Sequence, residues 1–201
     1  MKKIVLASKN LDKVKEMRLA LKDLPFEILS LADFAEMPDA VEDGATFEEN
    51  ALIKAKFFAE RTGLACLADD SGLEVDALNG LPGVHSARFA GYHADDNTNN
   101  QKLLDELNKV GVTESAAAYR CALAFVDTDG TEILTQGKVT GKVKTVAKGN
   151  GGFGYDPYFY LDANHTMAEI SAVEKNKISH RGEALRQMIL KLKGRFRSTA
   201  L

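Results

Sequence analysis

The sequence predicts an α/β fold with a mixed sheet flanked by helices. Two short apolar runs, residues 3–7 and 64–67, have the length and composition of buried strands. Side chains alternate between apolar and polar through residues 116–127, and turn residues separate them from an extended stretch at 131–143, which predicts an antiparallel hairpin. Segments with helical spacing lie between the strands. An α/β chain that also contains a hairpin should form a sheet of mixed direction.

The composition fits a single domain over residues 1–201. The chain is 45% hydrophobic and 27% charged, which is enough apolar material for a sizeable core. Its net charge of -3 gives no overall field that favours nucleic acid or an anionic membrane, although a basic site can still be local. The apolar start is too short for a signal peptide and no run is long enough to span a membrane, so we expect a cytoplasmic protein. Cys66 and Cys121 lack metal-binding spacing and are expected to be buried thiols.

The first strand leads through a polar turn at residues 8–10 into a helix. From Lys13 the apolar positions follow a helical spacing that ends before Pro25. Backbone N–H groups at the start of such a helix attract phosphate, and Asn10 and Lys13 would add a donor and a charge. A polar helix start without a ligand is the alternative. Residues 26–31 are expected to form the next strand.

A second helix is predicted from Thr46 to about Arg61. Thr46 and Glu49 have the spacing of a capping box, in which each side chain bonds the backbone of the other. That role accounts for Glu49, whereas Glu42, in the acidic loop before the helix, has no such local explanation and is a candidate metal ligand. Lys54 either extends to solvent, as most helical lysines do, or faces a phosphate.

Two adjacent carboxylates, Asp69 and Asp70, follow the second apolar run directly. Ser71 and Gly72 predict a turn, so both carboxylates are expected at the end of a strand. Ligands of open α/β sheets lie beyond such strand ends, where a carboxylate pair can hold a divalent metal and act as a general base. A strand-ending turn with solvated charges is the alternative.

A glycine-rich stretch at 149–154 formally matches GxGxxG. Residues 155–161 are predicted to be extended rather than helical, which excludes a dinucleotide-binding motif, and no Gly-Lys pair precedes Ser or Thr as a Walker A motif requires. The glycines allow close backbone approach to a ligand, and Phe153 offers a flat apolar face. A flexible loop is the alternative. Earlier in the chain, an ordered loop is expected at 74–88 and a helix at 97–107.

The last helix is predicted to begin after Ser179, which puts His180 and Arg181 in its first turn. The helix dipole disfavours cations there, so an anionic or keto-bearing ligand would supply an acceptor for them. An ordinary surface pair is the alternative. Before this helix, Thr166 and Glu169 have the spacing of another capping box, followed by a short helix.

These motifs, in this order and spacing, closely resemble the inosine/xanthosine triphosphate pyrophosphatase family over nearly the whole chain. They are SKNLDK at 8–13, TFEENA at 46–51 with Lys54, ADDSGL at 68–73, GFGYDP at 152–157 and SHRG at 179–182. The resemblance implies an elongated, two-lobed mixed α/β fold with a central cleft and a homodimer. It also implies Mg-dependent hydrolysis of ITP, dITP and XTP to the nucleoside monophosphate and pyrophosphate, which cleanses the nucleotide pool.

The resemblance further implies a set of site residues. Asp70 matches the proton acceptor and a magnesium ligand, and Glu42 is chosen as the second ligand over Val41 because valine cannot bind magnesium. Lys9 occupies a position where many members have glycine. The substrate contacts are a phosphate-binding turn, further lysines, a base site and a base-reading pair: Ser8, Lys9, Asn10, Leu11, Asp12, Lys13, Lys54, Ser71, Phe153, Gly154, Tyr155, Asp156, Lys175, His180 and Arg181.

The charges of these residues suit a nucleoside triphosphate. Its roughly four negative charges can be neutralised by Lys13, Lys54, Lys175 and a magnesium ion without making the whole surface basic. A carboxylate such as Asp70 can accept the proton of an attacking water, so no nucleophilic triad is needed. Two other functions stay open, a related pyrophosphatase for modified pyrimidine or methylated nucleotides and a non-catalytic nucleotide-binding module. Asp70 and the acidic loop argue against the second of these.

Overall fold

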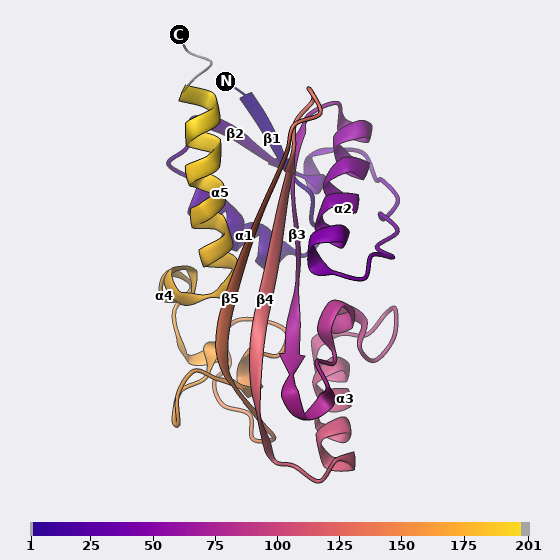
Figure 1. Ribbon diagram of the computed structural model, residues 1–201, viewed down its shortest axis with the longest axis vertical. Helices are drawn as coiled ribbons and strands as arrows, with labels where there is room; N and C mark the ends of the chain where they lie inside the picture. The colour runs from indigo at the N-terminus through magenta and orange to yellow at the C-terminus, as the bar shows by residue number, and fades with distance from the viewer. Residues whose placement is uncertain (1, 198–201) are drawn as a thin grey trace. The chain divides into compact units, whose positions relative to one another are not determined.

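The computed structural model describes residues 2–197 (Figure 1). The strands are β1 (Lys2–Leu6), β2 (Phe26–Ser30), β3 (Ala65–Val75), β4 (Glu114–Val126), β5 (Glu132–Lys144) and β6 (Phe159–Tyr160). The helices are α1 (Leu11–Leu21), α2 (Phe47–Thr62), α3 (Asp96–Lys109), α4 (Ala172–Ile178) and α5 (His180–Arg197). The strands predicted at 3–7, 26–31, 116–127 and 131–143 and the helix predicted at 97–107 are therefore confirmed.

Within residues 2–197 the strands form one six-stranded sheet in the order β2-β1-β3-β4-β5-β6. Strand β1 is parallel to both of its neighbours, with Val5 opposite Leu29 of β2 and Cys66 of β3. Strand β6 is antiparallel to β5. The predicted mixed sheet is thus confirmed.

The described residues divide into two compact units. Unit 1 comprises residues 2–70, 121–137 and 181–197, and unit 2 comprises residues 71–120 and 138–180. Strands β3, β4 and β5 contribute residues to both units. Whether they fold as the single domain predicted from composition stays a prediction. No helix among the described residues is long and apolar enough to cross a membrane.

Unit 1 buries helix faces against both sides of its strands. The apolar faces of α1 and α5 pack with β1, β3 and β4 in one core, because the residues that the helical periodicity aligns all point inward. Helix α2 lies on the other side of the strands in Figure 1. The first core includes Ile4, Leu6, Met17, Leu21, Leu67, Phe125, Leu185 and Met188, and α2 buries Phe47, Ala51, Ala55 and Phe58.

Unit 2 has its own core, built from parts of β3, β4, β5 and β6 together with α3. Helix α3 contributes Leu103 and Leu107, which are fully buried and four residues apart on one face. Aromatic rings fill the space around them, with Tyr119 and Phe159 at 4.6 Å between ring centroids. This core supports the glycine-rich loop described below.

Two local predictions are wrong. Asp69 and Asp70 do not end a strand, because β3 continues through them to Val75. Turn propensity is overridden here by tertiary contacts that compensate the buried charge. Residues 155–161 are mostly not extended either: a 3₁₀ turn occupies Asp156–Tyr158, and only Phe159–Tyr160 pairs as a strand.

Candidate active site

The turn before α1 is shaped by Asn10. Its side-chain oxygen accepts hydrogen bonds from the backbone N–H groups of Asp12 and Lys13, both at 3.0 Å, which makes Asn10 the N-cap. Its own N–H donates to Ser8 Oγ at 3.2 Å. Leu11, the first residue of the helix, is 66% exposed. The cap thus leaves the positive end of the helix dipole accessible to an anion.

The charged side chains of this turn contact exposed neighbours. Lys9 Nζ lies 2.7 Å from Asp39 and 3.1 Å from the carbonyl oxygen of Met37, so it binds the loop that precedes α2. Asp12 pairs with Lys15 at 3.1 Å. Such solvated ion pairs contribute little to stability, so both side chains can exchange partners at low cost.

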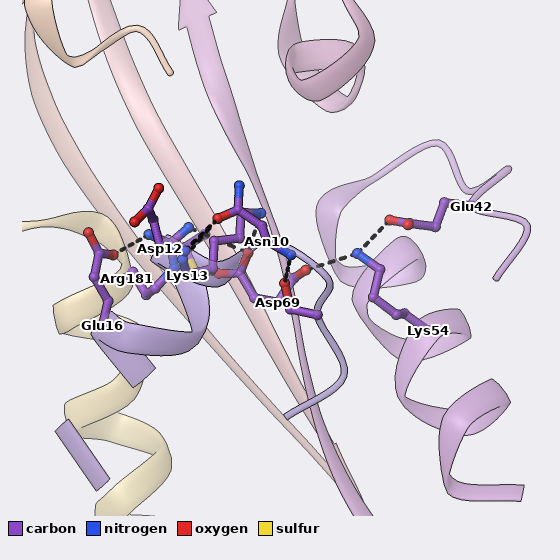
Figure 2. A network of polar contacts seen from close by, with 10 residues as sticks. Asn10, Asp12, Lys13, Glu16, Glu42, Lys54, Asp69 and Arg181 are labelled. Atoms are coloured by element: carbon purple, nitrogen blue, oxygen red, sulfur yellow. Dashed lines mark hydrogen bonds and ion pairs between the residues drawn. The ribbon is translucent and has the colours of Figure 1, made fainter. Parts of the chain in front are cut away.

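Asp69 lies at the centre of a buried ionic network in unit 1 (Figure 2). Its carboxylate is 2.5 Å from Lys13 Nζ and 2.8 Å from Arg181 Nε, and it accepts a hydrogen bond from Cys121 Sγ at 3.1 Å. Arg181 also pairs with Glu16 at 2.5 Å. Burial alone would raise the pKa of Asp69, but Arg181 and Lys13 hold that pKa well below its usual range. Asp69 is therefore ionised and held in place by protein partners.

The pKa of Asp70, the next residue along β3, is shifted in the opposite direction to that of Asp69. It is 8% exposed, and its Oδ2 is buried with no hydrogen-bond partner among the described residues. Burial raises its pKa to about 6, and Lys54 and Lys13 only partly offset that effect, while Glu42 and Asp69 add to it. A carboxylate with this pKa can exchange a proton near neutral pH.

Lys54 lies between the two carboxylate-bearing segments of unit 1. Its Nζ is 2.7 Å from Glu42 and 3.0 Å from the carbonyl oxygen of Asp69 (Figure 2). Glu42 and Asp70 interact electrostatically, and both carry the oxygen donors that Mg²⁺ prefers. Within residues 2–197, no group of three or more His, Cys, Asp or Glu side chains is arranged to hold a metal. A metal here would therefore take protein ligands from this carboxylate pair and complete its shell with other oxygens.

The start of α2 fixes the loop that carries Glu42. Thr46 caps the helix by accepting from the Glu49 N–H at 3.1 Å. The Glu49 carboxylate accepts from the Ala45 N–H at 2.7 Å, one residue earlier than the predicted capping box requires. Buried Asn50 accepts from the Gly44 N–H at 2.8 Å, and a Cβ on Gly44 would collide with both Glu49 and Asn50. The loop is therefore held close to the helix.

In unit 2 the glycine-rich loop is organised by Asp156. This carboxylate pairs with Lys175 at 2.6 Å, with both side chains at most 5% exposed, and accepts from the Phe153 N–H at 3.0 Å. The hydroxyl of Tyr119 also bonds it, and burial together with that carboxylate raises the pKa of Tyr119. Lys175 Nζ lies 4.3 Å from the centroid of the Phe153 ring. Gly152 has a φ of +71°, and a Cβ there would run into the Asp156 carboxylate.

Three other expected substrate contacts, Tyr155, His180 and Ser71, lie in the same unit. Tyr155 donates its hydroxyl to the carbonyl oxygen of Ser86 at 2.7 Å. The His180 ring stacks on Tyr119, with 4.8 Å between centroids and 13° between planes. Ser71 is half-buried in the part of β3 that belongs to unit 2.

The structure thus distributes the expected site residues over two groups. Unit 1 brings together Lys13, Lys54, Glu42, Asp70 and Arg181, with the turn at 8–12, and unit 2 holds Ser71, Phe153, Gly154, Tyr155, Asp156, Lys175 and His180. Sequence reasoning missed Glu16 and Tyr119. The spacing in the sequence could have predicted Glu16 as a neighbour of the site, since it lies three residues after Lys13 on one helix face.

The sequence pattern of the Ham1 family matches residues 4–191. The chain is 49% identical over 186 residues to a dITP/XTP pyrophosphatase from Geobacter sulfurreducens, covering 92% of this chain and 94% of that protein. A dITP/XTP pyrophosphatase from Clostridium perfringens is 46% identical over 201 residues, with 96% and 98% covered. Among solved structures, a HAM1 protein from Coxiella burnetii has a TM-score of 0.86 at 42% identity, covering 96% of this chain and 100% of that chain.

Proposed function

This chain belongs to the Ham1 family, and on that premise we propose that it is an Mg-dependent hydrolase that cleaves ITP, dITP and XTP to the nucleoside monophosphate and pyrophosphate. Relatives at 49% and 46% identity are named dITP/XTP pyrophosphatases, which supports the reaction class. The structural observation that supports it most is Asp70, a buried carboxylate with a pKa raised to about 6 beside Lys54 and Lys13. Such a group is suited to act as a general base at neutral pH.

Glu42 and Asp70 would hold the metal. Their fit rests on the buried Asp70 Oδ2, which has no hydrogen-bond partner among the described residues, and on the carboxylate oxygens that Mg²⁺ prefers. When bound, magnesium would supply positive charge against the phosphates and lower the pKa of a bound water. Asp70 would orient the attacking water and accept its proton, and Asp69 would stay ionised against Arg181.

Cations of the chain would bind the triphosphate. Lys13 and Lys54 already lie in the network around Asp69 and Asp70, and the α1 helix start with Asn10 and Ser8 adds backbone and side-chain donors. Charge-assisted contacts of this kind are stronger than neutral hydrogen bonds. Lys175 is proposed as a further substrate contact, although its ammonium also compensates the buried Asp156.

The purine would be recognised by residues of the glycine-rich loop and of the α5 start. Phe153 would stack on the base, while His180 and Arg181 would meet the 6-keto oxygen. Adenine carries an amino group at that position, so donor would face donor and the mismatch would reject ATP. Because Arg181 is paired with Asp69 and Glu16, its contact with a base would have to compete with these carboxylates.

Pyrophosphate release tests the proposal directly. The protein is assayed with Mg²⁺ and ITP, dITP, XTP, ATP, GTP and dUTP, and we expect the three deaminated purine nucleotides to be hydrolysed with the highest kcat/KM. Preference for dUTP or another pyrimidine would support the related pyrophosphatase, and binding without pyrophosphate release would support the non-catalytic module. A homodimer and action on the cytoplasmic nucleotide pool remain part of the proposal.

A further inference from the structure

The loop that carries Phe153 is bound from outside by two side chains of α3. The Gly154 N–H donates to Asp96 Oδ2 at 2.6 Å, and the Gly154 carbonyl accepts from Asn100 Nδ2 at 3.0 Å. Asp96 and Asn100 are four residues apart, so they lie on one face of the helix. Both backbone polar groups of Gly154 are thus bound to the same helix.

These contacts fix the backbone on one side of Phe153, and Asp156 fixes it on the other. Gly154 has a φ of +63° and Gly152 a φ of +71°, both in the left-handed region that favours glycine. The Phe153 N–H between them is bound to Asp156 at 3.0 Å. A phenylalanine side chain has two torsions and few rotamers, so the direction of its ring follows from a backbone held at both ends.

Asn100 has a buried polar atom that destabilises the folded state, and packing alone does not explain why this residue is present. It is 8% exposed, and its Oδ1 is buried without a hydrogen-bond partner among the described residues. The amide orientation follows from the Gly154 carbonyl, which requires the NH₂ end as donor. A buried acceptor left unpaired destabilises the folded state, so an apolar residue would suit the core of unit 2 better. The hydrogen bond from Asn100 to the Gly154 carbonyl offsets part of this destabilisation.

We propose that Asp96 and Asn100 are positioning residues of the base-binding loop, which hold Gly154 so that the Phe153 ring meets the purine. The inference rests on the proposed function, in which Phe153 stacks on the base. Both residues act through the loop and take no part in phosphate binding or proton transfer. Their loss therefore weakens nucleotide binding and leaves the chemical step unchanged.

The test compares three variants of the full chain by steady-state kinetics with ITP. In Asp96→Ala, KM should rise about tenfold with kcat within about twofold of wild type, since one charge-assisted hydrogen bond to the loop is lost. Asp96→Asn should keep a KM near wild type, because its amide oxygen still accepts from the Gly154 N–H. Asp95→Ala is the matched control: Asp95 caps the same helix through the Thr98 N–H at 2.8 Å, so this variant loses stability but keeps the loop contact.

A second measurement distinguishes a misplaced base-binding loop from a general loss of structure that would also weaken phosphate binding. Tripolyphosphate, which has no base, should inhibit Asp96→Ala and wild type with the same inhibition constant. Asn100→Leu removes the other contact without changing charge and should reproduce the rise in KM. The inference would be overturned if Asp96→Ala and Asn100→Leu both kept the wild-type KM, or if Asp95→Ala raised KM as much as Asp96→Ala does. It would also be overturned if the inhibition constant of tripolyphosphate rose in parallel with KM. Wild-type protein that releases no pyrophosphate from ITP would instead overturn the proposed function.

Discussion

Arg181 Nε and Asp69 Oδ2 form a 2.8 Å ion pair in the interior of unit 1, where neither side chain is more than 1% exposed. Glu16 and Lys13 complete the network at 2.5 Å each. Charges buried this deeply are tolerated only while their partners are present. The pair therefore links the start of α5 to the middle of β3 in a way that substitution should reveal.

Arg181→Ala should lower the free energy of unfolding by about 3–5 kcal/mol, because it leaves the Asp69 carboxylate buried with less compensation. The measurement is urea unfolding at pH 7. Lys193→Ala, an exposed change on the same helix, should shift stability by less than about 0.5 kcal/mol. Adding Asp69→Asn to Arg181→Ala should recover part of the loss, and no recovery would show that the arginine stabilises the fold through other contacts.

Asp70 should destabilise the metal-free protein above pH 6. Its folded pKa of about 6 exceeds the ordinary value of 3.8, so the folded state holds the proton more tightly than the unfolded chain. The penalty for ionisation is absent below about pH 4, grows as the pH rises, and is complete above about pH 6, at a size on the order of 3 kcal/mol. In EDTA, Asp70→Asn should therefore be more stable than wild type at pH 7.5 and equal to it near pH 4.

The same substitution should remove activity and the response to metal. The amide cannot accept a proton, so kcat with ITP should fall by about 10²–10⁴. Magnesium should raise the Tm of wild type and leave that of Asp70→Asn unchanged, because the charged ligand is gone. A variant that is less stable than wild type at pH 7.5, or that is still stabilised by magnesium, would contradict the assignment.

The contrast between Asp69 and Asp70 shows where sequence reasoning succeeds and fails. Helices α1 and α3 and the hairpin of β4 and β5 follow from periodicity, which is local information. The continuation of β3 through two carboxylates depends on Arg181, which is 112 residues away from Asp69, and no local pattern reports that partner. Turn propensity therefore predicted an end to the strand where the tertiary structure has none.

In the candidate site, too, local motifs predict which residues take part, whereas the contacts between them depend on the tertiary structure. The motifs placed Lys13, Lys54 and Asp70 in one expected site, and the structure brings these three together in unit 1. The individual partners, such as Glu16 for Arg181, depend on which helix faces meet in space. The capping box predicted at Thr166 and Glu169 is present, but it opens a 3₁₀ turn at Met167–Glu169. The short helix expected after it begins later, as α4 at Ala172–Ile178, because local spacing does not fix where so short a helix starts.

Lys54 and Lys56 provide a matched pair on α2. Lys54 contacts Glu42 and the Asp69 carbonyl, whereas Lys56 forms an exposed pair with Glu132 at 2.7 Å. Lys54→Ala should reduce kcat/KM for ITP about ten- to a hundredfold, since it removes a charge-assisted contact. Lys56→Ala should remain within about twofold of wild type. Equal kinetics for the two variants would show that Lys54 has no role in substrate binding.

Lys175 and Asp156 should be coupled in stability. Their 2.6 Å pair is buried in unit 2, so Lys175→Met should cost about 3–5 kcal/mol by leaving the carboxylate without its cation. Asp156→Asn combined with Lys175→Met should cost less than the sum of the single changes, which a double-mutant cycle of unfolding free energies measures. Additive losses would mean that Lys175 contributes through contacts other than Asp156.

Gly152 and Gly154 separate the cost of a left-handed backbone from the cost of disturbing Asp156. Their φ values of +71° and +63° are similar, so alanine at either position should pay a similar backbone strain of about 1–2 kcal/mol. A Cβ at position 154 meets nothing within 4 Å, whereas one at position 152 runs into the Asp156 carboxylate. Gly154→Ala should therefore lose only the strain energy and keep a KM for ITP within about threefold of wild type.

Gly152→Ala should lose more stability than Gly154→Ala, because Asp156 must move away from the Phe153 N–H and from Lys175. Its KM for ITP should rise about tenfold or more, as the ring of Phe153 loses one of the contacts that fix its backbone. Thermal melting and steady-state kinetics of the two variants provide the comparison. Because the backbone strain is similar in the two variants, the difference in stability between them reports the effect on Asp156. If both variants lost the same stability and showed the same KM, the Asp156 carboxylate would have no part in holding the loop.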